Sequence, residues 1–303
     1  MKNILIVGQG AIGLLWYYHL VKTNSDNKEV TLLTSQSDNQ LAQQVSCTLL
    51  SGVKNSVPLH RANNNSIKNA ELILICVKSF QVADVLKQIQ PQLNSQAKII
   101  LSHNGMGVID ELTSDFISQQ RLFTLLTTHG CKREASFDIT HTGSGNSDIG
   151  QLCGDNDTVS NQQIVKILDN ALSSVYWQDN IIIKQWTKLA INCVINPLTS
   201  LYNCINGEIS KLEYQPLIKQ LLNEIVTLAK CENITLTEDS LYMTVLDVAD
   251  KTYQNSSSMR CDVLAGKPTE IDYINGYIHR LGKKWNIATP ANSQLWQQIK
   301  NLS

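Results

Sequence analysis

The stretch Ile4-Leu5-Ile6-Val7-Gly8-Gln9-Gly10-Ala11-Ile12-Gly13 stands near the start of the chain. A short apolar run is followed directly by a G-x-G-x-x-G pattern, and residues 11–22 continue with apolar side chains at helical spacing. A strand, a glycine turn and a helix in this order are typical of a phosphate-binding βαβ unit. A chance glycine-rich turn is the alternative, but a second β-rich run about twenty residues on argues against it. We therefore predict that residues 8–13 bind the pyrophosphate of a dinucleotide at a helix N-terminus.

The rest of the first half repeats this alternation of β-rich runs and polar or amphipathic stretches. We expect strands at residues 4–7, 30–33, 72–77, 99–101 and 122–127. Such alternation predicts an α/β domain built on a Rossmann-type parallel sheet. Residues 137–150 alternate polar and apolar side chains around Gly143 and Gly145, which predicts a hairpin that closes this domain.

In the second half the hydrophobic pattern changes to long stretches with helical periodicity and few strand candidates. Residues 217–231 and 241–249 are examples, and another helix is expected to begin at Ile181. We predict a dinucleotide-binding domain over residues 1–170 and an all-helical substrate and catalytic domain over residues 171–303.

Composition excludes several classes of function. The chain has 303 residues with 25 basic and 26 acidic side chains, so no broad basic surface favours nucleic acid or anionic lipid. No apolar stretch reaches the roughly 18 residues that span a bilayer, and we expect a cytoplasmic protein without membrane partners. Its 8 cysteines are scattered without metal-ligand spacing, so we expect no metal site.

The end of the second expected strand indicates which dinucleotide is bound. An NAD enzyme usually carries Asp or Glu there for the ribose hydroxyls, whereas this chain has Leu33-Thr34-Ser35. Without that carboxylate a 2′-phosphate is tolerated, and Thr34 and Ser35 offer hydroxyl and amide donors. We therefore predict NADPH as the cofactor.

One helical segment of the second half carries polar residues in register. Lys188, Asn192 and Asn196 recur at every fourth position and line one face of an otherwise apolar helix, with Pro197 expected to end or kink it. Buried polar side chains need partners, so they form either a ligand site or internal hydrogen bonds that fix packing. A lysine in such a site can protonate the oxygen that forms when hydride reaches a ketone.

The sequence resembles the ketopantoate reductase (2-dehydropantoate 2-reductase) family over nearly its whole length. The resemblance is carried by these segments: Gly8 to Gly13, Cys76-Val77-Lys78, His103-Asn104-Gly105-Met106-Gly107, Trp186 to Pro197, Asn206-Gly207-Glu208, Ser257-Ser258-Met259 and Pro268 to Gly276. It implies NADPH-dependent reduction of 2-dehydropantoate to pantoate, on the route to pantothenate and coenzyme A.

The resemblance also implies roles for particular residues. Lys188 would be the catalytic lysine, and Glu270 would lie beside it and beside the nicotinamide ribose. Asn192, Asn196 and Asn206 would bind the substrate, and Ser258 would hold its carboxylate. The implied cofactor contacts add Lys78, Asn104, Cys131 and Glu270 to the residues predicted above, which are Gly8, Gln9, Gly10, Ala11, Ile12, Gly13, Thr34 and Ser35.

The chain departs from the family pattern at Ser35, where an arginine is common. We therefore expect a preference for NADPH over NADH that is narrower than in relatives with that arginine. Two other functions remain open, namely another 2-hydroxyacid or opine-type dehydrogenase and a non-enzymatic dinucleotide sensor. We expect a small-molecule substrate and either a monomer or a homodimer.

Overall fold

The computed structural model describes residues 1–23, 28–35 and 41–302, and the chain divides into two compact units. Unit 1 comprises residues 1–103 and 110–181, and unit 2 comprises residues 104–109 and 182–303. Residues 171–181, which we had expected in the second domain, pack with unit 1, because β11 (Val175–Trp177) pairs with β10 (Ser147–Cys153) at the edge of its sheet.

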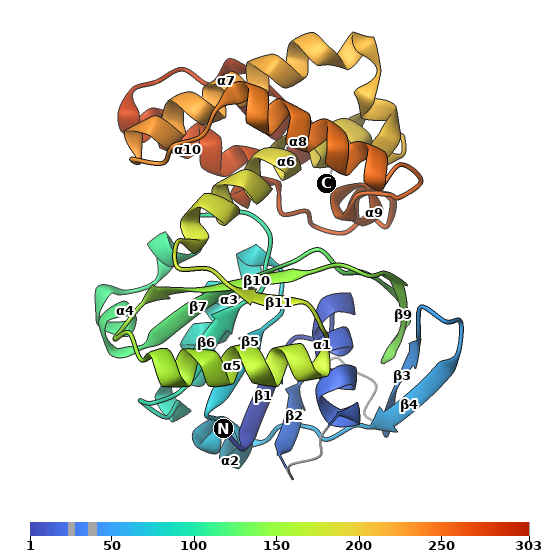
Figure 1. The fold of residues 1–303 in the computed structure, drawn as a ribbon, viewed down its shortest axis with the longest axis vertical. Coiled ribbons are helices and arrows are strands. Elements are labelled where there is room, and N and C mark those ends of the chain that lie inside the picture. Colours follow the sequence, from blue (N-terminus) through green and yellow to red (C-terminus); the bar gives the residue numbers. More distant parts are fainter. Residues whose placement is uncertain (24–27, 36–40, 303) are drawn as a thin grey trace. The chain divides into compact units, whose positions relative to one another are not determined.

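The main sheet of unit 1 has seven strands in the order β11-β10-β7-β6-β5-β1-β2 (Figure 1). Its other strands are β1 (Asn3–Val7), β2 (Glu29–Leu33), β5 (Leu72–Ile75), β6 (Lys98–Leu101) and β7 (Arg121–Thr127). Five neighbouring strands of this sheet, β2, β1, β5, β6 and β7, run parallel, and β10 pairs with β7 in the antiparallel sense. Strand β5, between β6 and β1, is buried at every position, as expected of a parallel strand covered on both faces. The predicted parallel-sheet domain is confirmed.

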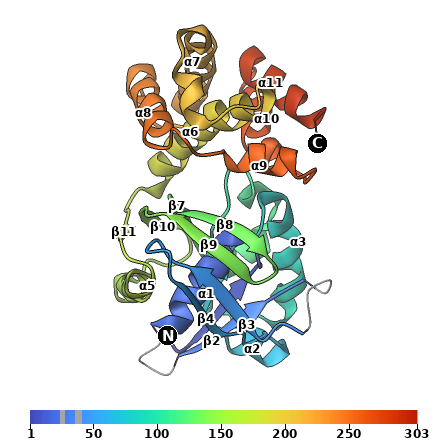
Figure 2. The same ribbon diagram turned by 90° about the vertical axis from the view of Figure 1, so that its right-hand side faces the viewer.

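Helices cover both faces of this sheet (Figure 2). On one face lie α1 (Ala11–Lys22) and α5 (Thr158–Ala171), and on the other lie α2 (Asn64–Asn69) and α3 (Ser79–Ile89). The unit also contains α4 (Ser114–Gln119) and the short turns η1 (Gln90–Gln92) and η2 (Ile109–Glu111).

A second, four-stranded sheet covers the outer side of α1. Its order is β4-β3-β9-β8, with bounds Lys54–Pro58, Gln44–Thr48, Asp138–Gly143 and Gly130–Ala135. Because α1 contacts both sheets, Trp16, Tyr17 and Tyr18 are fully buried although they follow one another around the helix.

The hairpin predicted over residues 137–150 is wrong. Its two halves, β9 and β10, belong to different sheets, and β9 instead forms a hairpin with β8 through a turn at Phe137, whose φ is 57°. The division follows from packing: Ile139 of β9 is buried in the core around α1, while β10 pairs with β7 along most of its length.

Unit 2 is all-helical in the part of the chain that the structure describes, which confirms the predicted fold class. Its helices are α6 (Ile181–Leu201), α7 (Gln215–Cys231), α8 (Glu238–Lys251), α9 (Ser258–Leu264), α10 (Asn275–Trp285) and α11 (Pro290–Lys300), with turns η3 (Asn206–Ser210), η4 (Leu212–Tyr214) and η5 (Ile271–Tyr273). Over the described residues, no helix combines the length and apolar character that crossing a membrane requires.

The longest helix, α6, does not end at Pro197 as one reading of the sequence allowed. It continues to Leu201, although Pro197 has no N–H to donate to the carbonyl of Cys193 four residues earlier. The fully buried Asn275 supplies the missing donor, because its Nδ2 lies 3.0 Å from that carbonyl oxygen. A side chain from another helix thus completes the backbone hydrogen bonding of α6.

Candidate active site

The glycine turn of unit 1 has the shape that a pyrophosphate needs. A Cβ atom on Gly13 would collide with the carbonyl oxygen of Gly8, so only glycine allows the turn to close this tightly. A Cβ atom on Gly10 would meet nothing nearer than the Cys76 carbonyl at 3.8 Å, which leaves room beside the backbone. The first turn of α1 has no acidic residue and no side-chain cap on its N-terminus. Its amide groups and the positive end of the helix dipole therefore suit a bound anion.

The end of β2 lies beside this turn. The Gln9 side chain donates from Nε2 to Ser35 Oγ at 3.1 Å and accepts from the Ser35 amide at 3.2 Å. The backbone amide of Ser35, a predicted donor to the 2′-phosphate, thus donates to the Gln9 side chain in this structure. The Thr34 hydroxyl oxygen accepts from Arg61 Nη1 at 3.3 Å. Gln9 therefore connects the glycine turn to Ser35 after β2, and Arg61 contacts the neighbouring Thr34.

Two other predicted cofactor residues, Cys131 and Lys78, lie near the glycine turn in the fold or in the sequence. The thiol of Cys131, in β8, points at the carbonyl of Ala11 at 3.4 Å. Burial raises the pKa of this thiol to about 12, so it stays neutral and does not repel an anion at neutral pH. Lys78 stands two residues after Cys76, whose carbonyl packs against Gly8, and it immediately precedes α3.

The predicted polar face formed by Lys188, Asn192 and Asn196 lies on the single helix α6. Lys188 and Asn192 are half-buried, whereas Asn196 is only 6% exposed. The opposite side of α6, including Leu189, Cys193 and other apolar residues, belongs to the core of unit 2. Because α6 is continuous, the three polar side chains stay on one face at successive turns.

Two of the predicted substrate ligands keep a buried polar atom without a hydrogen-bond partner among the described residues. These atoms are Nδ2 of Asn192, a donor, and Oδ1 of Asn206, an acceptor. Buried amide atoms are normally paired, because an unpaired one costs about 1–3 kcal/mol. An asparagine at 192 that only fixed packing would be expected to pair this group internally, so the observation favours a ligand site.

Asn206 and Ser258 are held by the segment that joins α8 to α9. The Asn206 amide donates to the Asn255 carbonyl at 3.0 Å, and its Nδ2 donates to Thr252 Oγ1 at 3.0 Å. Ser257 caps α9, and its hydroxyl lies 2.7 Å from that of Thr199 in α6. The exposed Ser258, the next residue, therefore begins α9 beside the last turns of α6.

Glu270 and Asn104 meet within unit 2, although they are 166 positions apart in the sequence. Asn104 Nδ2 donates to Glu270 Oε2 at 3.2 Å, and the Glu270 side chain is buried. The approach depends on Gly105, whose φ is +81° and whose Cβ would collide with the carbonyl of Tyr273. Met106 then donates its amide to the same carbonyl at 2.8 Å.

Sequence reasoning missed two residues of this arrangement. Arg61 lies outside every motif, and only the pairing of its segment with β2 brings it to Thr34. Asn275 is part of a quoted segment, but its role depends on the missing N–H of Pro197, which gave the one usable signal. Within the described residues, no group of three His, Cys, Asp or Glu side chains is placed to hold a metal ion.

Comparison with known proteins identifies the family. The model described as "Ketopantoate reductase PanE/ApbA" matches residues 4–154, and that described as "Ketopantoate reductase PanE/ApbA C terminal" matches residues 180–303. The chain belongs to the ketopantoate reductase family. A relative from Vibrio cholerae named 2-dehydropantoate 2-reductase is 35% identical over 99% of this chain and 97% of its own length.

Solved structures show the same fold at lower identity. A D-mandelate dehydrogenase in a ternary structure with NADH and anilino(oxo)acetate has a TM-score of 0.88 at 22% identity, covering 99% of this chain and 97% of its own. A dimeric ketopantoate reductase from Staphylococcus aureus has a TM-score of 0.80 at 20% identity, covering 99% and 98%. At these identities the two structures show only that this member of the ketopantoate reductase family shares their fold.

Proposed function

We propose that this protein is a 2-dehydropantoate 2-reductase, which reduces the ketone of ketopantoate to the hydroxyl of pantoate with NADPH, on the route to pantothenate and coenzyme A. Beyond family membership, the observation that supports this most is the pair of buried, unpartnered amide atoms on Asn192 and Asn206. One is a donor and the other an acceptor, which suits an oxygen-rich substrate with both carboxylate and hydroxyl groups.

The cofactor residues are those of unit 1 that fit an anion. The amides at the start of α1 would bind the pyrophosphate, and Gly10 would allow it to approach the backbone. Thr34, Ser35, Lys78 and Cys131 of unit 1 would hold the dinucleotide, and the family resemblance adds Asn104 and Glu270 as residues that would bind its nicotinamide end. When bound, NADPH supplies the hydride.

The substrate residues are those of unit 2. Lys188 donates a proton to the ketone oxygen and stabilises the negative charge that develops there. Asn192, Asn196 and Asn206 hold the keto acid by their amide groups, and Ser258 donates its hydroxyl to the carboxylate. Glu270, held by Asn104, orients the lysine. Holding the ketone in a fixed position lowers the entropic part of the barrier.

A kinetic assay tests the proposal. The rate of NADPH oxidation is measured with ketopantoate and with a panel of other 2-keto acids that includes pyruvate and phenylglyoxylate. We expect kcat/KM for ketopantoate to exceed the others by about tenfold or more, since its hydroxyl and methyl groups add contacts. A higher value for another keto acid would indicate a different 2-hydroxyacid dehydrogenase, and dinucleotide binding without any turnover would indicate a sensor.

For assembly and location we propose a monomer or homodimer in the cytoplasm, with a small molecule as its substrate. The dimeric relative from Staphylococcus aureus supports the homodimer. Light scattering at several protein concentrations distinguishes the two assemblies.

A further inference from the structure

The outer edge of β2 carries an additional backbone segment, residues 60–62. Leu32 donates its amide to the His60 carbonyl at 2.9 Å, and Ala62 donates to the Leu32 carbonyl at 2.9 Å, so Arg61 stands beside Leu32 in a parallel bridge. The buried Tyr17 fixes the same segment, because its hydroxyl accepts from the His60 amide at 2.7 Å and donates to the Pro58 carbonyl at 2.9 Å. The backbone on which Arg61 stands is therefore held on two sides.

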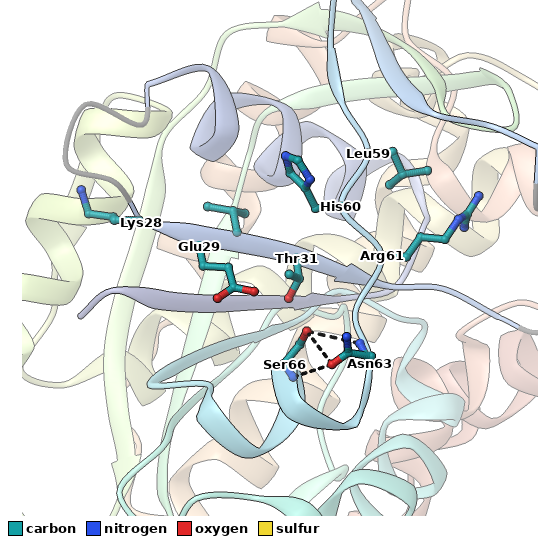
Figure 3. A pocket seen from close by; sticks show the side chains of 9 residues that line it. Lys28, Glu29, Thr31, Leu59, His60, Arg61, Asn63 and Ser66 are labelled. Carbon is teal, nitrogen blue, oxygen red and sulfur yellow. Dashed lines mark hydrogen bonds between the residues drawn. The ribbon is translucent and has the colours of Figure 1, made fainter.

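The Arg61 side chain extends along β2 toward the carboxyl end of that strand. Figure 3 shows it pointing away from Glu29 and from Ser66, which line the same pocket nearer the beginning of the strand. Its Nη1 donates to Thr34 Oγ1 at 3.3 Å, and its Nη2 donates to the Ala42 carbonyl at 3.2 Å. The guanidinium also lies over the Phe137 ring, 5.1 Å from its centroid.

Arg61 lies beside the residues that distinguish NADPH from NADH in a dinucleotide-binding fold. The residues directly after β2 read the 2′ position of the adenosine ribose. Here those residues are Thr34 and Ser35, neither of which carries a charge. An arginine is always charged, and its planar fork matches the oxygen geometry of a phosphate.

We propose that Arg61 recognises the 2′-phosphate of NADPH and supplies the positive charge that Ser35 lacks. The charge comes from the neighbouring segment of the fold rather than from the position where the family pattern has its arginine. The proposal rests on the proposed function only in assuming that the cofactor is a nicotinamide dinucleotide. It predicts a wide preference for NADPH, in place of the narrow one expected from Ser35 alone.

The direct test measures binding without catalysis. Isothermal titration calorimetry gives the Kd of NADP⁺ and of NAD⁺ for the unmodified protein and for Arg61→Met, which keeps an apolar stem but removes the charge. A charged hydrogen bond is usually worth about 10- to 150-fold in affinity, so we expect NADP⁺ to bind weaker by roughly that factor. The Kd of NAD⁺ should change by less than about threefold. Arg133→Met is the matched control, because Arg133 of β8 donates to the Ala135 carbonyl and to Ser136 Oγ in the turn after that strand.

A second variant separates loss of charge from loss of folding. Arg61→Lys keeps the charge and should retain part of the preference for NADP⁺. Raised salt should weaken NADP⁺ binding more in the unmodified protein than in Arg61→Met, since a charge pair is screened. An equal loss for both dinucleotides would overturn the proposal and indicate stacking on the adenine, and an unchanged Kd for NADP⁺ would overturn it too.

These outcomes are distinct from failure of the proposed function. If the unmodified protein binds NADP⁺ through Arg61 but does not reduce ketopantoate, the cofactor assignment stands and the substrate assignment falls. If it reduces ketopantoate equally well with NADPH and NADH, the reaction stands and the role of Arg61 falls.

Discussion

Lys188 is the residue on which the chemistry depends most, because its ammonium group lies one turn before Asn192 on the polar face of α6 and can donate a proton. Lys188→Ala should lower kcat by about 100-fold or more, as expected for a lost general acid. Its melting temperature should change little, since the side chain is only half-buried. Lys184→Ala is the control, one turn earlier on the same helix and exposed. Near-normal turnover by folded Lys188→Ala would refute the assignment.

Asn192 should contribute to binding but not to folding. Its Nδ2 is buried without a partner among the described residues, so the free protein bears the cost of desolvating it. Asn192→Ala should weaken ketopantoate binding by roughly 1–3 kcal/mol and leave the free energy of unfolding unchanged or slightly higher. Denaturant titration and the KM for ketopantoate measure the two effects. A clear loss of stability with unchanged KM would instead assign Asn192 to packing.

At the scale of the element, α6 depends on a side chain that stands outside it. Asn275 completes the hydrogen bonding of the Cys193 carbonyl that Pro197 leaves open, and Asn275 Nδ2 is also 3.0 Å from Asn292 Oδ1. Asn275→Leu should therefore destabilise unit 2 by about 1–3 kcal/mol, because it leaves a buried carbonyl unpaired. Adding Pro197→Ala restores an N–H at the right position and should recover part of that loss. Strictly additive effects of the two substitutions would contradict this coupling.

A histidine cluster between α1 and the small sheet of unit 1 predicts sensitivity to acid. A ring nitrogen of His129 lies 3.3 Å from one of His141, and the ring centroids of His19 and His141 are 6.0 Å apart. Burial lowers the pKa of all three, that of His19 from 6.5 to about 4. Because the unfolded chain binds these protons first, their contribution is fully present above pH 6.5 and is lost as the pH falls toward 4.

The acid effect can be assigned to one residue. Allowing for partial exposure, proton uptake by His19 in the unfolded chain should remove about 1–2 kcal/mol of stability between roughly pH 7 and pH 5. Urea denaturation at the two pH values measures this, and His19→Gln should reduce the difference. An unchanged pH dependence in that variant would show that other groups cause the effect.

At the scale of the whole molecule, local patterns predicted the elements better than their partners. The run Ile4 to Gly13 and the helical spacing of Lys188, Asn192 and Asn196 are short-range signals, and the strand, turn and helix they predicted are present. The pairing of β9 with β8 and β3 depends on which face covers α1, and this is a property of three-dimensional packing. Arg61 escaped prediction for the same reason, since β2 and residues 60–62 meet only in the fold.

The central claim is that this ketopantoate reductase family member transfers a hydride from NADPH to the ketone of ketopantoate. The most direct measurement supplies NADPH in which both hydrogens at nicotinamide C4 are deuterium and analyses the product by mass spectrometry. The account predicts pantoate that carries deuterium at its hydroxyl carbon, and little of it from Lys188→Ala in the same time. Pantoate without deuterium, or no pantoate from a folded protein that binds NADPH, would contradict the account.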